Sequence, residues 1–345
     1  MTKRVLVTGA RGFVGAHCLG PLVARGYEAH AVSRRAPAPP TRGPTGAANA
    51  VSAVTWHQAD LLDAAQTAAL VRAVRPTHLL HLAWEVTPGA FWTSPLNWPW
   101  VDASLRLLAA FGESGGQRAV MVGSCAEYGA PDGPCLERST PLAPTTLYGA
   151  CKAALSVMLP AFAGAAGVES AAWARLFYLF GPGEPASRLV PSAVQSLEAG
   201  AELACTHGEQ VRDVLYVADV ADALAAVLDS GVTGAVNVGA GHGTSLRALL
   251  SAVEREYGDP RLLRFGARPA APDDPPYLVA DTTRLSQEVG WTPGVSLEDG
   301  IRQTIAWWRG EPRGHHPERP AHDPEAPGDR TVSRGRAAYG GRDGG

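Results

Sequence analysis

RVLVTGARGFVG, residues 4–15, joins a short apolar run to a glycine-rich turn near the N-terminus. The run predicts a strand, and residues 14–25, which Gly26 ends, predict a helix. In such a turn Gly9 permits the tight bend, Gly12 lets the backbone approach a pyrophosphate, and Gly15 allows close helix–strand packing. The positive end of the helix then faces the phosphates, so the stretch predicts dinucleotide binding rather than a plain strand–helix turn. The residues expected at the cofactor here are Gly9, Arg11, Gly12, Phe13, Val14 and Gly15.

Strand-like and helix-like segments alternate along the first half of the chain. Strands are predicted at 4–7, 28–32, 55–59, 77–82, 119–122 and 170–176, and helices at 14–25, 64–74, 101–112 and after Tyr148. This alternation predicts an α/β fold, a Rossmann-type doubly wound parallel sheet. After Phe180 the regularity weakens, which predicts a smaller C-terminal α/β lobe.

The expected organisation is a dinucleotide-binding domain over 1–180, to which some later segments return, and a mainly substrate-binding lobe over 181–309. Residues 36–50 are rich in Pro, Ala and Gly, as in a mobile surface insertion. Residues 310–345 hold six Arg against six Asp and Glu and almost no large apolar side chain, so we expect a disordered tail. Its histidines are expected to be solvated rather than to bind metal.

Composition excludes several classes of protein. The 345 residues are 46% hydrophobic and 18% charged, which is too apolar for an intrinsically disordered chain. A net charge of −3 suggests neither nucleic acid nor an anionic membrane as a partner. Five scattered cysteines without a CxxC pair argue against disulfides or zinc and favour a reducing cytoplasm. The uncharged, apolar stretch 153–168 is interrupted by Pro160 and two glycines, so we expect a buried helix and no membrane span.

The end of the second predicted strand bears on the choice of cofactor. NAD sites usually place Asp or Glu there to hold the ribose 2′-hydroxyl, but residues 32–35 are VSRR. Ser33 does not repel a 2′-phosphate, and Arg34 can pair with it, with help from Arg11. The sequence therefore favours NADP(H) and leaves NAD(H) possible. The alternative is that these arginines are solvated loop charges.

Two further strand ends are expected beside the cofactor. Asp60 and Leu61 follow the third strand, where the Asp60 carboxylate either accepts from an adenine amino group or caps the following helix. Leu82 and Ala83 follow His81 at the end of the fourth strand, at the carboxyl edge of the sheet.

The catalytic candidates are Ser124, Tyr148 and Lys152. Tyr148 and Lys152 stand four apart, on one face of the predicted helix. An ammonium and an oxidised nicotinamide lower the pKa of a phenol, which can then exchange a proton with a substrate oxygen. Lys152 is one of only two lysines in the chain, which favours a functional role. Ser124, after the fifth strand, is expected to hydrogen-bond the same substrate oxygen.

These motifs together resemble the extended short-chain dehydrogenase/reductase family, in its NAD(P)-dependent nucleotide-sugar epimerase/dehydratase/reductase branch. The likeness spans about residues 3–309 and continues through RLFYLFGP (175–182), RDVLYVADV (212–220), ADTTR (280–284) and GWTP (290–293). The resemblance implies that the substrate is a nucleotide sugar and that Ser124, Tyr178 and Arg212 contact it. For Arg212, expected at the diphosphate, the alternative is a structural salt bridge.

Departures from the family pattern bear on the reaction. The 4,6-dehydratases of the family carry Asp-Glu after the strand-five hydroxyl, but this chain has Cys125 and Ala126, and Glu127 comes one position late. The 4-epimerases usually keep the acid at the end of strand two, where Ser33 stands. We therefore expect an NADPH-dependent ketoreductase of a nucleotide-linked keto-deoxysugar, with a 4-epimerase that retains NAD as the alternative. A 4,6-dehydratase and a non-catalytic dinucleotide-binding module are the weaker hypotheses.

Two expectations concern surfaces. Residues 84–100 contain four tryptophans and Phe91, and their prolines predict a loop. We expect this loop to be a lid that excludes water from the site. Equally, it could form a satellite hydrophobic cluster or a contact between subunits. The helix after Tyr148 is apolar on more than one face, from Ala153 to Phe162, and a partner helix would cover it. Together with the family resemblance, this predicts a homodimer.

Overall fold

The computed structural model describes residues 3–35, 53–258, 262–271 and 274–310. Contacts divide the chain into a compact unit, Met1–Gly310, and a second unit, Glu311–Gly345. All described residues belong to the first unit. The expected mobile insertion at 36–50, and all of the expected tail except Gly310, lie outside the described residues.

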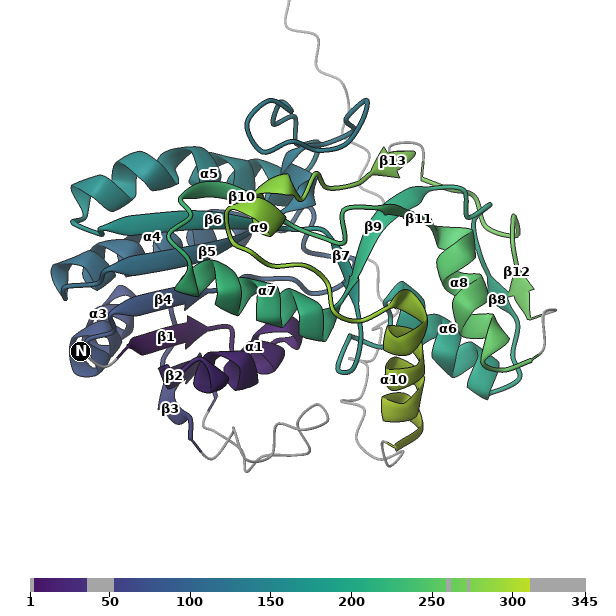
Figure 1. Ribbon diagram of the computed structural model, residues 1–345, viewed down its shortest axis with the longest axis horizontal. Coiled ribbons are helices and arrows are strands. Elements are labelled where there is room, and N and C mark those ends of the chain that lie inside the picture. The colour runs from purple at the N-terminus through teal and green to yellow at the C-terminus, as the bar shows by residue number, and fades with distance from the viewer. Residues whose placement is uncertain (1–2, 36–52, 259–261, 272–273, 311–345) are drawn as a thin grey trace, which may run out of the picture. The chain divides into compact units, whose positions relative to one another are not determined.

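Seven parallel strands form the central sheet, in the order β3-β2-β1-β4-β5-β6-β10 (Figure 1). The chain adds β2 and β3 on one side of β1 and β4 to β6 on the other, so the strand order reverses between β1 and β4. The predicted doubly wound α/β fold is confirmed. The strands are β1 (Arg4–Thr8), β2 (Glu28–Ser33), β3 (Thr55–Gln58), β4 (His78–His81), β5 (Arg118–Ser124), β6 (Ser170–Leu176) and β10 (Gly234–Val238).

Helices cover both faces of this sheet, because successive side chains of a strand point to opposite faces. In β1, Val5 and Val7 pack with α1 and α7, whereas Leu6 packs with α3, α4 and α5. All three side chains are fully buried, which explains the unbroken apolar run of this strand. The helices are α1 (Phe13–Ala24), α3 (Ala64–Val74), α4 (Asn97–Glu113), α5 (Leu147–Ala165) and α7 (Val217–Asp229).

Helix α5 is the one helix among the described residues that is long and apolar enough to cross a membrane. Tyr148, Cys151 and Leu155 on this helix belong to the buried cluster between the sheet and α3, α4 and α5, which is the arrangement of a core helix. The opposite face is open, with Val157 70% and Met158 40% exposed.

A smaller group of elements follows β6 and packs around its own apolar cluster, which includes Phe180, Val194, Leu250 and Ile305. Strand β7 pairs with β9, which lies between β11 and β13, and β12 pairs with β8. From within this half of the sequence, α7, β10 and α9 (Thr283–Gln287) return to the central sheet. The other elements are β7 (Tyr178–Phe180), α6 (Leu189–Glu198), β8 (Leu203–Ala204), β9 (Val211–Tyr216), β11 (Gly243–Ser245), α8 (Leu246–Arg255), β12 (Leu263–Arg264), β13 (Tyr277–Leu278) and α10 (Leu297–Gly310).

Candidate active site

A cavity of about 1500 Å³ lies at the carboxyl edge of the central sheet, where ligands bind in open parallel sheets. Its walls come from the turn after β1, the ends of β2, β4 and β5, the start of α5 and the segment from β6 to β7. Most residues that the sequence assigned to cofactor, catalysis or substrate line it: Gly9, Arg11, Gly12, Phe13, Val14, Gly15, Ser33, Arg34, Leu61, Leu82, Ala83, Ser124, Tyr148, Lys152 and Tyr178. Asp60 and Arg212 are not among the described lining residues.

The turn after β1 leaves no room for side chains at two of its glycines. Gly9 has a φ of +67°, and a Cβ on it would lie 2.8 Å from the Ala83 backbone N. A Cβ on Gly15 would lie 2.2 Å from the Gly9 carbonyl oxygen. Helix α1 begins at Phe13, and Gly12 at its N-cap supplies no capping side chain. The first N–H groups of α1 therefore face the cavity without a side-chain cap, and this cradle fits the pyrophosphate of a dinucleotide.

The end of β2 presents Ser33, Arg34 and Arg35 to the same cavity. The Ser33 Oγ accepts from the Arg35 N–H at 3.3 Å, and the Gln58 amide donates to the Arg34 carbonyl at 3.3 Å, so the backbone is held here. Among the described residues that line the cavity, the only carboxylate is Asp274.

Asp60 lies apart from the cavity lining. Its Oδ1 accepts from the Leu62 N–H at 3.0 Å and closes a turn. The expected alternative for Asp60, a cap of the following helix, is wrong: Asp63 caps α3 by accepting from Ala65 and Gln66. Asp63 stands three positions after Asp60, directly before α3, which spans Ala64–Val74 as the sequence predicted.

A buried polar chain holds the end of β4, and sequence reasoning missed it. The Thr8 Oγ1 accepts from the backbone N–H groups of Leu82 and Ala83 and contacts His81 Nδ1 at 2.8 Å. His81 Nε2 lies 2.9 Å from the Ser104 hydroxyl, and burial lowers the His81 pKa to about 3, so the ring is neutral. This chain positions the backbone of Leu82 and Ala83 at the cavity.

Ser124, Tyr148 and Lys152 come together at the end of β5 and the start of α5. The Thr146 hydroxyl caps α5 by accepting from the Gly149 N–H, and this places Tyr148 in the first turn. Its phenol is hydrogen-bonded to Ser124. The Lys152 ammonium donates to the Val122 carbonyl at 2.8 Å and lies 3.8 Å from the centre of the Trp84 ring.

Burial favours the neutral forms of both Lys152 and Tyr148. Burial lowers the pKa of Lys152 to about 7, and burial raises the pKa of Tyr148. Desolvation is the largest influence on the Tyr148 pKa in this structure. The expected lowering of this pKa involves an oxidised nicotinamide as well as Lys152 and stays a prediction. The hydrogen bond from Ser124 and the charge of Arg188 act in the lowering direction.

Comparison with known proteins places this site in a family. The family model described as "NAD dependent epimerase/dehydratase family" matches residues 5–239, from β1 to the end of β10. This chain belongs to the NAD-dependent epimerase/dehydratase family. The expected membership of the extended short-chain dehydrogenase/reductases is thereby confirmed, and the chain is an enzyme of this nucleotide-sugar family.

Individual relatives of this family member are epimerases by name. The UDP-glucose 4-epimerase of Azospirillum brasilense is 29% identical over 334 residues, which cover 89% of this chain and 92% of the relative. A solved UDP-glucose 4-epimerase of Thermus thermophilus, in complex with NAD, is 30% identical with a TM-score of 0.76 and covers 89% and 99% of the two chains. A UDP-glucose 4-epimerase from Stenotrophomonas maltophila, with bound NAD and formylated UDP-arabinopyranose, is 25% identical with a TM-score of 0.76 and covers 89% and 98%.

An aromatic wall closes the site of this family member on one side. Trp84, Phe91 and Trp100 are almost fully buried and, with Trp92, line the cavity. The rings of Trp84, Phe91 and Trp92 meet the Tyr148 ring edge-on, with centroids 6.4, 4.9 and 5.8 Å away.

The expected loop 84–100 is only partly a loop, because α4 begins at Asn97. Pro99 is tolerated there, since the first turn of a helix has no intrahelical partners for its N–H groups. Trp84, Phe91 and Trp100 belong to the large cluster under the sheet, whereas Trp98 is 63% exposed. The segment is therefore a core wall of the site rather than a separate satellite cluster.

Tyr178, Arg188 and Asp274 line the cavity on the side where the substrate is expected. Arg212 lies behind this wall, where it is 2% exposed, donates to Asp274 at 2.5 Å and packs 5.3 Å from the centre of the Tyr178 ring. The structure thus gives Arg212 the salt bridge that was the alternative to a direct substrate contact. Sequence reasoning did not single out Arg188, because no local motif marks it.

Among the described residues, no group of three or more His, Cys, Asp or Glu is arranged to hold a metal ion.

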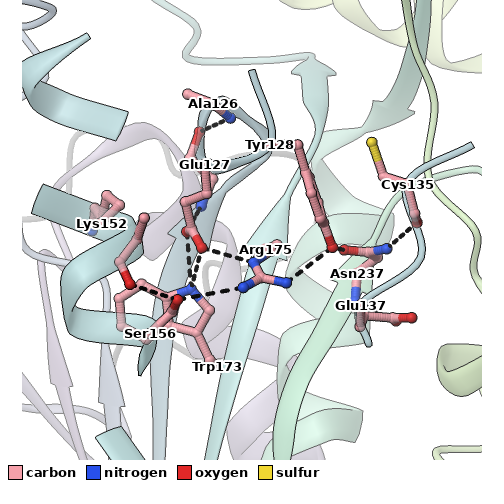
Figure 2. A network of polar contacts seen from close by, with 12 residues as sticks. Ala126, Glu127, Tyr128, Cys135, Glu137, Lys152, Ser156, Trp173, Arg175 and Asn237 are labelled. Atoms are coloured by element: carbon pink, nitrogen blue, oxygen red, sulfur yellow. Dashed lines mark hydrogen bonds and ion pairs between the residues drawn. The ribbon is translucent and has the colours of Figure 1, made fainter. Parts of the chain in front are cut away.

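The segment after Ser124 places no carboxylate in the cavity. Cys125 and Ala126 line it, and burial raises the pKa of the Cys125 thiol to about 12, so the thiol stays protonated. Glu127 turns the other way, into the interior, where it pairs with Arg175 (Figure 2).

Proposed function

We propose that this family member is an NADPH-dependent ketoreductase acting on a nucleotide-linked keto-deoxysugar. The observation that carries the proposal is a single cavity with three components. It holds the glycine cradle of Gly9 to Gly15, the cationic end of β2, and Ser124 with Tyr148 and Lys152.

When bound, a nicotinamide dinucleotide supplies the hydride. Ser124 and Tyr148, already hydrogen-bonded to each other, orient and polarise the substrate carbonyl. Tyr148 then donates its proton to the oxygen on which negative charge develops. Lys152 holds the cofactor ribose and places a positive charge beside the phenol, while the aromatic wall excludes water from this space.

The protonation state of Tyr148 supports reduction. Burial raises the pKa of the phenol, so it is protonated at neutral pH, as the acid of a carbonyl reduction must be. Oxidation of a hydroxyl, the first step of an epimerisation, requires the deprotonated phenol instead.

The walls support a deoxysugar and argue against dehydration. The rings of Phe91 and Trp92 beside Tyr148 present a largely apolar surface, which favours a sugar face that lacks a hydroxyl. A 4,6-dehydratase needs an acid and a base beside the sugar, but Cys125 and Ala126 occupy the wall there. The set of three catalytic side chains also argues against a non-catalytic dinucleotide-binding module.

Cofactor turnover tests the proposal. The full-length chain is incubated with NADPH and nucleotide-linked 4-keto-6-deoxyhexoses, and NADPH absorbance and the sugar product are followed together. We expect one NADPH to be consumed for each sugar reduced, with Tyr148→Phe as the inactive control. Interconversion of nucleotide-linked 4-epimers without net cofactor consumption would reject the proposal.

A second candidate is a nucleotide-sugar 4-epimerase that retains NAD. The names of the relatives favour it, since the Azospirillum and Thermus proteins are UDP-glucose 4-epimerases and the latter holds NAD. Denaturation of the freshly purified chain separates the two hypotheses. An epimerase should release tightly held NAD when it is denatured. A reductase should release little dinucleotide, or its bound dinucleotide should exchange with NADPH added before denaturation.

A homodimer and a cytoplasmic location belong to the same proposal. The open face of α5, with Val157 and Met158, suits a partner copy, and the core position of α5 argues against a membrane. The five cysteines are free, as in a reducing compartment. We expect a dimer in sedimentation equilibrium and a monomer for Val157→Glu; a monomeric wild type would reject the dimer.

A further inference from the structure

Glu127 is a fully buried carboxylate that no step of the proposed reaction uses. It ends the short 3₁₀ turn η1 (Cys125–Glu127), which follows β5 directly. Ser124 caps this turn: its hydroxyl accepts from the Ala126 N–H at 3.2 Å. In return, the Glu127 carboxylate accepts from the Ser124 backbone N–H at 2.8 Å. The backbone of the catalytic serine is therefore tied to this carboxylate.

The other contacts of Glu127 lead to the helix that carries Tyr148 and Lys152 (Figure 2). Its Oε2 accepts from Arg175 Nε at 2.7 Å, and Trp173 Nε1 donates to both oxygens, at 2.9 and 3.1 Å. Arg175 in turn donates to the hydroxyl of Ser156 at 3.3 Å. Ser156 is one turn after Lys152 on α5, on the same helical face. One buried ion pair thus joins the segment of Ser124 to α5.

The chain makes room for this arrangement at Gly123. A Cβ on Gly123 would lie 2.1 Å from Trp173 Nε1 and 2.4 Å from Glu127 Oε1. The carboxylate and the indole therefore occupy the space that a side chain at position 123 would fill. A buried ion pair is weak evidence for stability by itself, because apolar residues of similar volume often serve as well. Its position, directly behind Ser124 and joined to the backbone N–H of that residue, points to another role.

We propose that Glu127, held between Trp173 and Arg175, is a positioning residue that sets Ser124 relative to Tyr148 and Lys152 and balances the buried Lys152 ammonium. The proposal rests on the proposed function, since it assigns Glu127 to that reaction. Glu127 touches neither cavity nor substrate and acts only through the other residues.

Electrostatics agree with this geometry. The charge of Glu127 raises the pKa of both Lys152 and Tyr148. For Lys152 this opposes desolvation, which lowers the pKa, whereas for Tyr148 it adds to desolvation, which raises the pKa. Other charged or titratable groups also lie near Lys152 and Tyr148. Cys151 raises the pKa of Lys152, Cys125 raises and Arg188 lowers that of Tyr148, and His81 is neutral. Removal of the Glu127 charge should therefore move both pKa values to lower pH.

The test compares Glu127→Gln with Glu137→Gln in the full-length chain. Glu137 is the control: its carboxylate is half-buried and accepts from the Asn237 N–H at 2.9 Å (Figure 2). Asn237 is linked through the Tyr128 hydroxyl to Arg175, so Glu137 lies at the far end of the same network. NADPH affinity is measured by isothermal titration across pH, because Lys152 is expected to hold the cofactor in its charged form. For wild type we expect affinity to fall above pH 7, near the Lys152 pKa. For Glu127→Gln this fall moves down by about one pH unit, as loss of one nearby buried charge implies.

Turnover supplies the second readout. We expect Glu127→Gln to lower kcat at least about tenfold with little change in KM, because Ser124 is displaced rather than the binding walls. Glu137→Gln should leave both the pH profile and kcat as in wild type. A Glu127→Gln protein with the wild-type pH profile and kcat would overturn the proposal. If no nucleotide sugar is turned over by wild type, the proposed function fails, yet the cofactor profile still decides the role of Glu127.

A paired substitution covers the case in which Glu127→Gln does not fold. In Glu127→Gln, the new amide group would place a hydrogen-bond donor against the donors of Arg175 or Trp173. The double variant Glu127→Met with Arg175→Met instead removes both charges together, a change that buried ion pairs often tolerate. We expect this double variant to keep a melting temperature near that of wild type and to lose kcat. A stable double variant with full kcat would show that the pair is only structural.

Discussion

Arg34→Ala is expected to remove most of the preference for NADPH over NADH. Arg34 and Arg35 line the cavity at the end of β2, and the Ser33 side chain beside them carries no charge. The Arg34 carbonyl is held by Gln58, so the substitution removes the guanidinium without freeing the backbone. NADH lacks the 2′-phosphate, so its affinity should not change.

The magnitude follows from the exposure of Arg34. A charge-assisted hydrogen bond contributes about 1.5–3 kcal/mol. Arg34 is exposed, and screening by solvent reduces this to about 1–2 kcal/mol. At about 1.4 kcal/mol per decade, wild type should bind NADPH roughly 5–30 times more tightly than NADH. Raising the ionic strength should narrow this difference, since the pair is close to solvent.

Isothermal titration with NADPH and with NADH measures this difference in affinity. Arg34→Ala should bring the two dissociation constants together, and Ser33→Asp with Arg34→Ala should invert the preference, because the new carboxylate accepts from a 2′-hydroxyl and repels a phosphate. Arg72→Ala serves as the control, since this exposed arginine of α3 is not among the described residues that line the cavity.

Equal affinity of wild type for NADH and NADPH would refute this reasoning. The arginines would then be solvated charges, and the epimerase with retained NAD would replace the reductase as the leading hypothesis. An equal loss of NADPH affinity in Arg72→Ala would show a general charge effect rather than a specific contact.

Three further predictions concern single side chains. Tyr148→Phe should lower kcat roughly 10² to 10⁴-fold and leave the NADPH dissociation constant nearly unchanged, because only the proton donor is lost; near-normal kcat would remove Tyr148 from the mechanism. Gly15→Ala should abolish cofactor binding and lower the melting temperature, since its Cβ would meet the Gly9 carbonyl at 2.2 Å, whereas Gly20→Ala in the same helix has open space and should be neutral or stabilising. Glu184 has a pKa raised to about 8 by burial, so its ionisation destabilises the fold increasingly as pH rises from about 4.5 through 8. Glu184→Gln should therefore raise the melting temperature above pH 8 and not below pH 4.5; an equal effect at both ends would contradict this.

The sequence alone was sufficient for the fold class and for most of the residues that line the cavity. Glycine spacing, the alternation of strands with helices and the Tyr148–Lys152 spacing are local patterns, and each follows from the geometry of one turn or one helix. Because parallel strands all end at one edge of the sheet, local motifs placed after successive strands had to meet in one cavity. Gly9, Ser33, Ser124 and Tyr148 were therefore within reach of sequence reasoning.

Tertiary structure decided the partners of the buried charges. Arg212 pairs with Asp274, 62 residues later, and Glu127 with Arg175, 48 residues later. Neither pairing has a local signal, because it depends on which strands become neighbours and on their register. The burial that raises the pKa of Tyr148 was also beyond the sequence, since it depends on the aromatic side chains that pack around the phenol. Local motifs predict which side chains meet in the cavity, but long-range contacts determine how each of these side chains is oriented and buried.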